Sequence, residues 1–194
     1  RSGESRTPYV VAMKRLARPV LIRPLVRHLA THRELDEQIT GIIARLGDEA
    51  AELLVLELAE SQQRNERRTI FDILVKLKSG HQALRHSLTD PRWYVARNAA
   101  ELLGQIQAEG AAGDLTELLK HADDRVRRAA TSSLAMFTSQ QGTTEPLIRA
   151  LNDPSSTVRA AAAAGLGARR NAKALDAMLA RFDKEDNNEV LNAL

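Results

Sequence analysis

The sequence predicts an all-α protein built as an array of repeated helical hairpins. First, residues 90–104 recur downstream at a nearly constant period, and self-similarity of this length is typical of helical repeat arrays. Second, four valines mark the repeat at intervals of 31, 32 and 32 residues: Val95, Val126, Val158 and Val190. Third, hydrophobic residues make up 43% of the chain but aromatic residues only 3%. This composition favours helices packed through alanine and leucine over a β-sheet.

The residues around each valine also recur, and they predict the core. With the valine as position 0, leucines recur at positions −11, −7 and +8, and alanines recur at +4. We expect stacked hairpins to bury these positions in one continuous core, because a single hairpin cannot bury its own apolar face. The leucines are Leu84, Leu115, Leu147 and Leu179 at −11, Leu88, Leu119 and Leu151 at −7, and Leu103, Leu134 and Leu166 at +8; the alanines are Ala99, Ala130 and Ala162.

The N-terminal part is less regular. Residues 1–8 are polar and aperiodic, so we expect a disordered arm. Helices are expected at residues 9–18 and 20–31, separated because Pro19 and Pro24 each remove a backbone donor. A further helix over residues 34–46 should end at Gly47. Residues 9–47 therefore form a predicted basic helical cap, a degenerate copy of the repeat.

Residues 48–194 are predicted to form the array itself, with a truncated last repeat. One pair of helices is expected at residues 48–61 and 65–78. Three clear repeats follow, with short A helices at 81–88, 114–120 and 144–151 and longer B helices at 91–107, 124–137 and 155–168. A last A helix is expected at 172–182. Asp90-Pro91 and Asp153-Pro154 are predicted as N-cap and first residue of their B helices, and Gly165 should mark a close helix approach.

These motifs resemble the short bacterial HEAT repeats that also occur in phycobilisome lyases. The resemblance is strong over residues 80–168 and weaker over 20–194. It implies a right-handed α–α superhelix, a solenoid of about five to six stacked hairpins with the B helices on its concave side. It also implies a non-enzymatic scaffold that binds proteins. The residues that carry it are Asp90-Pro91 with Val95 and Arg97, residues 126–130, and Asp153-Pro154 with Val158-Arg159 and Leu166-Gly167.

Arginines recur just after the position-0 valine. In HEAT-like proteins an arginine here commonly pairs with the turn aspartate of a neighbouring repeat, and we expect such a structural ladder. A row of arginines that faces a ligand is the alternative. The arginines stand at +1 in some repeats and at +2 in others, which argues against one aligned anion-binding stripe: Arg97, Arg127, Arg128 and Arg159.

Stacked B helices are also expected to gather a partner-binding groove. Trp93 and Arg97 are its strongest candidates, because tryptophan and arginine are enriched among binding hot spots. The alternative for Trp93 is that it only packs over the turn between helices. The full candidate set is Trp93, Arg97, Asn98, Glu101, Arg125, Arg128, Ser132 and Arg159.

The 194-residue chain has a net charge of +3 that is unevenly distributed. Residues 1–33 carry eight basic groups and one acidic group, whereas the remainder carries 20 basic and 24 acidic groups. This segment is predicted either to bind phosphates, anionic lipid or an acidic protein surface, or to be a solvated cap or to fold against a missing domain. The predicted basic patch is Lys14, Arg15, Arg18, Arg23 and Arg27.

No catalytic, cofactor or metal site is predicted. The sequence has no cysteine, no glycine-rich phosphate loop, no nucleophile elbow and no zinc-hydrolase motif. His28 and His32 have a metal-compatible spacing of four residues, but a third ligand such as Asp36 would need the turn to fold back.

Three functions remain as hypotheses. The first is a protein-interaction scaffold that uses the concave B-helix surface. The second is a nucleic-acid-binding array in the manner of HEAT-like DNA glycosylases, favoured by a pI near 9.5 but opposed by the acidic repeats and the single tryptophan. The third is an enzyme-associated module of the lyase type. The longest uncharged run, residues 129–144, is too short to span a bilayer of roughly 30 Å. We therefore expect a soluble chain, and we also expect a cytoplasmic location. Because the sequence lacks an initial Met, we expect it to be a fragment of a larger protein.

Overall fold

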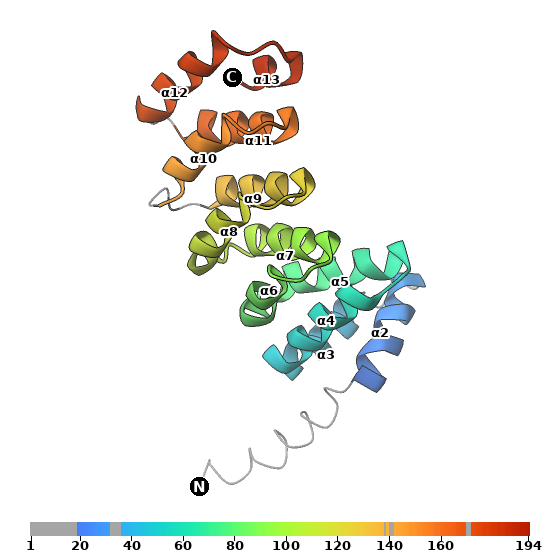
Figure 1. Cartoon of the computed structure of the whole chain (residues 1–194). Helices are drawn as coiled ribbons and strands as arrows, with labels where there is room; N and C mark the ends of the chain where they lie inside the picture. The colour runs from blue at the N-terminus through green and yellow to red at the C-terminus, as the bar shows by residue number, and fades with distance from the viewer. Residues whose placement is uncertain (1–18, 32–35, 138, 140–141, 170–171) are drawn as a thin grey trace, which may run out of the picture. The chain divides into compact units, whose positions relative to one another are not determined.

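The computed structural model describes residues 19–31, 36–137, 139, 142–169 and 172–194 (Figure 1). Within these ranges the chain forms twelve α-helices, one 3-10 turn and no β-strand. The predicted all-α class, built from stacked helical hairpins, is confirmed. The helices are α2 (Pro19–Thr31), α3 (Asp36–Leu46), α4 (Asp48–Glu60), α5 (Arg64–Leu77), α6 (His81–Ser87), α7 (Trp93–Gln105), α8 (Ala112–Leu118), α9 (Asp124–Met136), α10 (Thr144–Ala150), α11 (Ser156–Gly167), α12 (Ala172–Phe182) and α13 (Asn188–Ala193), and the 3-10 turn is η2 (Glu109–Ala111).

The chain divides into two compact units, an N-terminal unit of Arg1–Ala83 and a C-terminal unit of Leu84–Leu194. The predicted disordered arm, residues 1–8, and the predicted helix at 9–18 lie outside the described residues. The boundary predicted after residue 47, between cap and array, stays a prediction.

In the N-terminal unit, α2 packs against α4 and α5 as well as α3. Its buried stripe consists of Ile22, Val26 and Leu29, each at most 2% exposed, at the spacing of one helix face. The helix predicted at residues 20–31 is present as α2, which begins at Pro19 and continues through Pro24 to Thr31. Pro24 lies on the exposed side of α2. Burial of the stripe on the opposite side offsets the backbone hydrogen bond that Pro24 cannot donate.

In the C-terminal unit the helices form two rows (Figure 1). The B helices α7, α9, α11 and α13 pack on one another in sequence order, and α8, α10 and α12 form the A row beside them. Each A helix is joined to the following B helix by a short turn. Equivalent residues of successive repeats therefore lie side by side along the B row.

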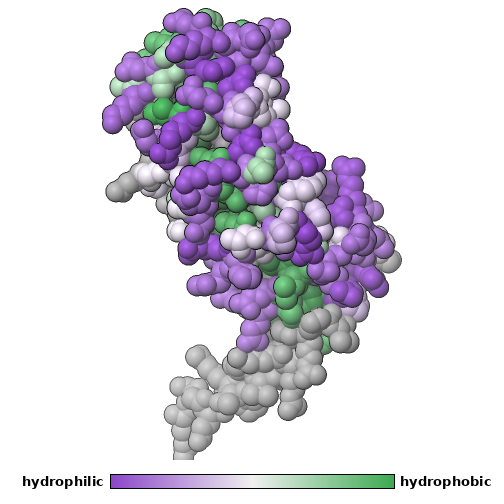
Figure 2. Space-filling model, viewed as in Figure 1, coloured by the Kyte–Doolittle hydropathy of each residue, from purple (hydrophilic) through white to green (hydrophobic). Residues whose placement is uncertain are grey.

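The predicted core register is confirmed except at Leu119 and Leu179. Leu119, at −7, is only half-buried, and its neighbour Leu118 is buried instead. The position-0 valines are at most 5% exposed, and the +4 alanines at most 2%. The leucines at −11 are fully buried in α6, α8 and α10, but Leu179 in α12 is 58% exposed. Leu175 and Phe182 are exposed beside it, and Figure 2 shows hydrophobic side chains gathered over this end of the unit. The prediction for Leu179 was wrong because no helix among the described residues covers this side of α12.

Successive B helices cross where one small residue meets a glycine. Gly104 of α7, at +9, faces Ser133 of α9, at +7, and a Cβ on Gly104 would lie 2.6 Å from Ser133 Oγ. At the next crossing Ala135 of α9, at +9, faces Gly165 of α11, at +7, so closely that a Cβ on Gly165 would collide with Ala135. The close approach predicted for Gly165 is confirmed. Both crossings pair position +9 of one B helix with position +7 of the next. The glycine stands at +9 in the first crossing and at +7 in the second.

The predicted N-caps at Asp90 and Asp153 were wrong. The N-cap residues of α7 and α11 are Arg92 and Ser155, two residues later, and neither uses its side chain as a cap. Each aspartate instead accepts the backbone N–H of that N-cap residue, at 2.8 Å in both repeats. This local bond folds the turn rather than capping the helix.

None of the helices that the structure describes has both the length and the hydrophobicity needed to cross a membrane.

Candidate functional site

The turns between A and B helices in the C-terminal unit share one acceptor position. The side chain at −5 accepts the backbone N–H at −3 in every repeat, although its chemistry changes. A carboxylate serves in three repeats and an imidazole nitrogen in one. The pairs are Asp90 with Arg92 (2.8 Å), His121 Nδ1 with Asp123 (3.0 Å), Asp153 with Ser155 (2.8 Å) and Glu185 with Asn187 (3.1 Å).

Arginines at +1 tie two of these turns to the preceding repeat. Arg127 donates two hydrogen bonds to Asp153, both of 2.8 Å, and a third to the carbonyl of His121 in its own turn. Arg159 repeats the pattern, with bonds of 2.8 and 2.7 Å to Glu185. The arginine ladder expected from the family resemblance is therefore present at these two steps. Bidentate pairing of this kind fixes geometry as well as charge.

The ladder is absent at the step from α7 to α9. There the +1 residue is Ala96, which is fully buried, and the −5 residue of the next turn is His121. Both partners of the ion pair are thus replaced together. The α7–α9 step must be held by other contacts.

A cation–π cluster joins α7 and α9 at this step. The guanidinium carbon of Arg125, from α9, lies 3.4 Å from the centre of the Trp93 ring, and that of Arg97 lies 5.6 Å from it. Tyr94 meets Trp93 edge-on, with ring centres 6.0 Å apart, and Arg92 stands 6.0 Å from the Tyr94 ring. Stacking of Arg125 on Trp93 links successive repeats where the ion pair is missing.

The arginines after the valine separate into two sets. Those at +1, Arg127 and Arg159, form the ion pairs of the ladder with Asp153 and Glu185. Those at +2, Arg97 and Arg128, occupy equivalent positions on the adjacent helices α7 and α9. Arg128 is exposed and has no hydrogen bond or ion pair to any other residue that the structure describes.

The remaining residues predicted for the groove have different surroundings. Asn98 is 8% exposed, and its amide oxygen accepts from Arg97 Nε and Nη2 at 3.2 and 2.6 Å. Glu101 lies 3.8 Å from Arg97, and Ser132 is half-buried. Arg159 is only 9% exposed in its pair with Glu185, so the ladder explains why an arginine recurs at +1 without a ligand.

The acidic partners stay ionised well below neutral pH. Hydrogen bonds from Arg125 lower the pKa of Asp123 to about 2, and those from Arg159 lower the pKa of Glu185 to about 2. The hydrogen bond from Arg92 also lowers the pKa of Asp90. Each of these arginines therefore faces a full negative charge at pH 7.

The two described residues of the predicted basic patch, Arg23 and Arg27, are paired within the N-terminal unit. Arg23 donates to both carboxylate oxygens of Glu57 at 2.9 Å, and Arg27 donates to the buried Glu66 at 3.2 Å. These contacts favour the interpretation of a structural cap. Lys14, Arg15 and Arg18 lie outside the described residues, as does His32, the partner proposed for His28.

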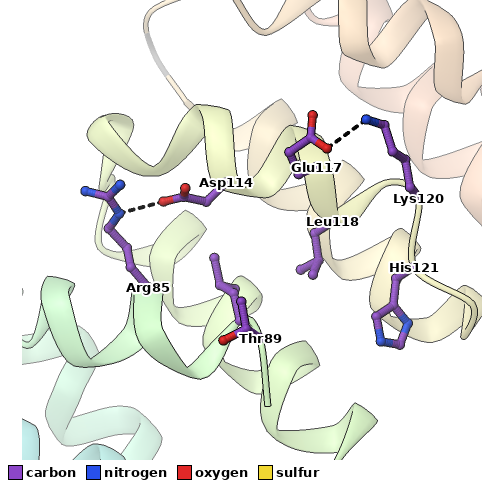
Figure 3. Close-up of a pocket in the computed structure, with 8 residues that line it drawn as sticks. Arg85, Thr89, Asp114, Glu117, Leu118, Lys120 and His121 are labelled. Carbon is purple, nitrogen blue, oxygen red and sulfur yellow. Dashed lines mark hydrogen bonds and ion pairs between the residues drawn. The ribbon is translucent and has the colours of Figure 1, made fainter. Parts of the chain in front are cut away.

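A pocket opens between α6, α8 and the turn after α8 (Figure 3). It has a volume of about 380 Å³, and Leu88 and Leu118 give it an apolar lining. Ion pairs of Arg85 with Asp114 and of Lys120 with Glu117 stand at its rim. No sequence pattern indicated this pocket. Across the described ranges, no cluster of three or more histidines and acidic residues could hold a metal ion.

Stacked hairpins with a recurring turn acceptor and an interrepeat arginine ladder define a helical repeat protein. The family model of HEAT repeats matches the chain twice, over residues 81–144 and residues 139–194. These matches cover more than half of the sequence, and the chain belongs to the HEAT repeat family. A search of the curated proteins found no match.

Solved structures with the same fold share little sequence with this chain. An engineered protein matches over 90% of this chain and 86% of its own, with 19% identity and a TM-score of 0.52. YibA from E. coli matches over 100% of this chain and 74% of its own, with 20% identity and a TM-score of 0.57. The complex of CpcE and CpcF of phycocyanin lyase from Nostoc matches with 19% identity over 91% and 92% of the two chains, but with a TM-score of only 0.32. The first two likenesses show the fold and say nothing of function.

Proposed function

We propose that this chain is a non-enzymatic scaffold in the cytoplasm that holds a protein partner on the B-helix face of α7 and α9. This B-helix face consists of Trp93, Tyr94, Arg97, Glu101, Arg125, Arg128 and Ser132. The observation that carries the proposal is the Trp93 cluster. Three of its side chains, Trp93, Arg97 and Arg125, are of the types that dominate binding hot spots, and the repeat pattern requires none of them.

The small number of tryptophan and tyrosine residues in the chain strengthens this interpretation. The chain has one tryptophan and two tyrosines, and two of these three residues meet on the B-helix face. Tyr94 is 37% exposed, and Arg125 keeps 54% of its side chain exposed although it is stacked and ion-paired. A partner that covers this face would desolvate a preformed stack and would order few new side chains. In a HEAT solenoid the B helices line the concave side, which is where we place the partner.

Capture of the partner from the source cell tests the proposal. The immobilised wild-type chain is compared with Trp93→Ala and Arg97→Ala, and we expect each variant to retain at least about tenfold less of the specific partner, since a hot-spot truncation costs 2 kcal/mol or more. Phe182→Ala is the matched control, because Phe182 is an exposed aromatic residue on α12. Thermal unfolding of each variant checks that it is folded. Equal capture by all four proteins would exclude this face as the binding site.

Nucleic-acid binding is the second candidate, supported by the pI near 9.5. It predicts binding of duplex DNA at low salt and a steep loss of affinity as salt increases, because each neutralised phosphate releases counterions. A titration at two salt concentrations decides between the two candidates. No binding at low salt removes the nucleic-acid hypothesis.

A further inference from the structure

We infer that the ligand of the B-helix face is an acidic peptide segment, whose carboxylates bind Arg97 and Arg128 while a neighbouring apolar side chain packs on the aromatic cluster. This inference rests on the proposed function and specifies the chemistry of the partner.

Charge distribution is the first support. Helices α7, α9 and α11 carry five arginines and two acidic residues, whereas the whole C-terminal unit carries 14 basic and 14 acidic residues. Positive charge is therefore concentrated on the B helices. The ladder neutralises Arg127 and Arg159, and Asp123 neutralises Arg125. Arg97 has only a long ion pair of 3.8 Å with Glu101, and Arg128 has none among the described residues, so these two arginines are the least neutralised.

The register of these two arginines is the second support. Both stand at +2, so they occupy equivalent places on adjacent helices. The same position in α11 is Ala160, which ends the row after two cations. Packed helices lie about 8–10 Å apart, and an extended chain rises about 3.3 Å per residue. Two carboxylates about three residues apart in an extended segment match this spacing.

The geometry of the two guanidinium groups also suits carboxylates. Arg97 is held by the amide oxygen of Asn98 at 2.6 Å, and its nearest acid, Glu101, is 3.8 Å away. Asn98 is buried and fixes the orientation of the guanidinium without neutralising its charge. Arg128 has no acidic partner among the described residues. A partner carboxylate thus meets one pre-oriented cation and one uncompensated cation.

A polyanion such as DNA suits the face less well. Its backbone requires a long row of cations, but of the five arginines here only Arg128 has no ion pair among the described residues and only Arg97 has one as long as 3.8 Å. The carboxylates of Asp90, Asp123 and Asp124 lie at the N-terminal ends of the same helices, where they would repel a phosphate backbone. A short acidic peptide needs only the two cations Arg97 and Arg128.

Trp93 provides the readout, because it is the only tryptophan in the chain. The probe is a blocked peptide of about a dozen residues, with two glutamates about three positions apart and leucines beside them. Its counterpart carries glutamine in place of both glutamates. We expect the glutamate peptide to change Trp93 emission and to bind at least about tenfold more tightly than the glutamine peptide, with affinity that falls as salt increases.

Arginine variants locate the contact. Arg97→Gln and Arg128→Gln should each weaken binding of the glutamate peptide about fivefold or more, because each removes one ion pair that the partner desolvates. Arg149→Gln is the matched control, since Arg149 is an exposed arginine on α10, in the A row. It should leave the affinity unchanged.

Three outcomes would overturn the inference: equal binding of the two peptides, an equal effect of the Arg149 change, or displacement of the glutamate peptide by duplex DNA at equimolar phosphate. Partner capture that depends on Trp93, together with equal binding of the two peptides, would leave the scaffold function standing and remove only its acidic ligand.

Discussion

Replacing Glu185 with alanine should lower the free energy of unfolding of the C-terminal unit by about 3 kcal/mol, because it breaks a buried ion pair from one side. The Glu185 side chain has no exposed surface, and it accepts hydrogen bonds from Arg159, Arg181 and the backbone N–H of Asn187. Without it, two mostly buried guanidinium groups lose their counter-charge and the turn before α13 loses its acceptor. Urea unfolding followed by circular dichroism measures the loss.

Asp186 provides the matched control for this prediction. It is the adjacent acidic residue, it is exposed, and it makes no hydrogen bond to another described residue. Asp186→Ala should change stability by no more than about 0.5 kcal/mol, as is usual for surface substitutions. Hydrogen exchange should show the Glu185 variant losing protection first in α13, since repeat arrays unfold by neighbouring units. Similar losses in the two variants would contradict a special role of the buried pair.

The same carboxylate predicts a pH dependence. Its pKa is lowered from 4.5 to about 2 in the folded chain, chiefly by the hydrogen bonds of Arg159. A lowered pKa means that the stabilisation is fully present above about 4.5 and is lost as the pH falls toward about 2. The stability of Glu185→Gln, which cannot ionise, should lack this part of the acid sensitivity. Parallel pH profiles for wild type and variant would show that the ion pair does not stabilise the fold.

Periodicity alone predicted the repeats because the core positions depend on spacing. Val126, Ala130 and Leu134 are all buried as the register requires. The predicted burial of Leu179 was wrong because a repeat register tells only which side of a helix is apolar. Burial also requires a neighbouring helix that covers this side. The exposed fraction of Leu179, 58%, reflects the absence of such a neighbour among the described residues.

The turn chemistry was only partly predictable. Asp153-Pro154 indicates a turn before a helix, but an aspartate can serve as N-cap or can accept an N–H within the turn itself. The choice depends on which residue first adopts helical geometry, and sequence patterns locate helix ends only within a few residues.

The candidate site was predictable where the repeat pattern failed. Trp93 was identified because the pattern does not require it, and its neighbour Arg125 followed from stacking equivalent helices. The sequence also showed that Ala96 replaces the arginine at +1 and that His121 replaces the aspartate at −5 of the following repeat. The meaning of this paired replacement emerged only when the structure showed which positions the ladder joins. Whether this face binds a partner stays a prediction.

Replacing Gly104 with alanine should destabilise the C-terminal unit by about 1–3 kcal/mol, the usual cost of overpacking. An alanine Cβ there would lie 2.6–2.8 Å from Oγ, Cβ and Cα of Ser133. The Ser133 side chain has little freedom to move, because it is 1% exposed and donates to the carbonyl of Ala100 at 2.7 Å. The helices α7 and α9 must therefore separate or shift. Thermal and urea unfolding measure the effect.

Gly167 is the matched control, because it occupies the same +9 position in α11. There an added Cβ would meet only Met178 Cε, at 3.8 Å, which is an ordinary contact. Gly167→Ala should be neutral or stabilising by up to about 1 kcal/mol, since alanine favours a helix more than glycine. The same substitution thus has opposite signs at two equivalent positions. If both variants were stabilised, close approach at the α7–α9 crossing would not limit the packing of the array.

A double variant tests the cause of the loss directly. Gly104→Ala combined with Ser133→Gly places alanine at +9 against glycine at +7, which is the pair that Ala135 and Gly165 form at the next crossing. The double variant should recover most of the stability lost by Gly104→Ala, less about 1 kcal/mol for the hydrogen bond from Ser133 to Ala100. Because glycine at either position relieves the same contact, the crossing requires one glycine per pair and not glycine at a fixed position. Recovery in the double variant would explain why the glycine alternates between +9 and +7 along the B row.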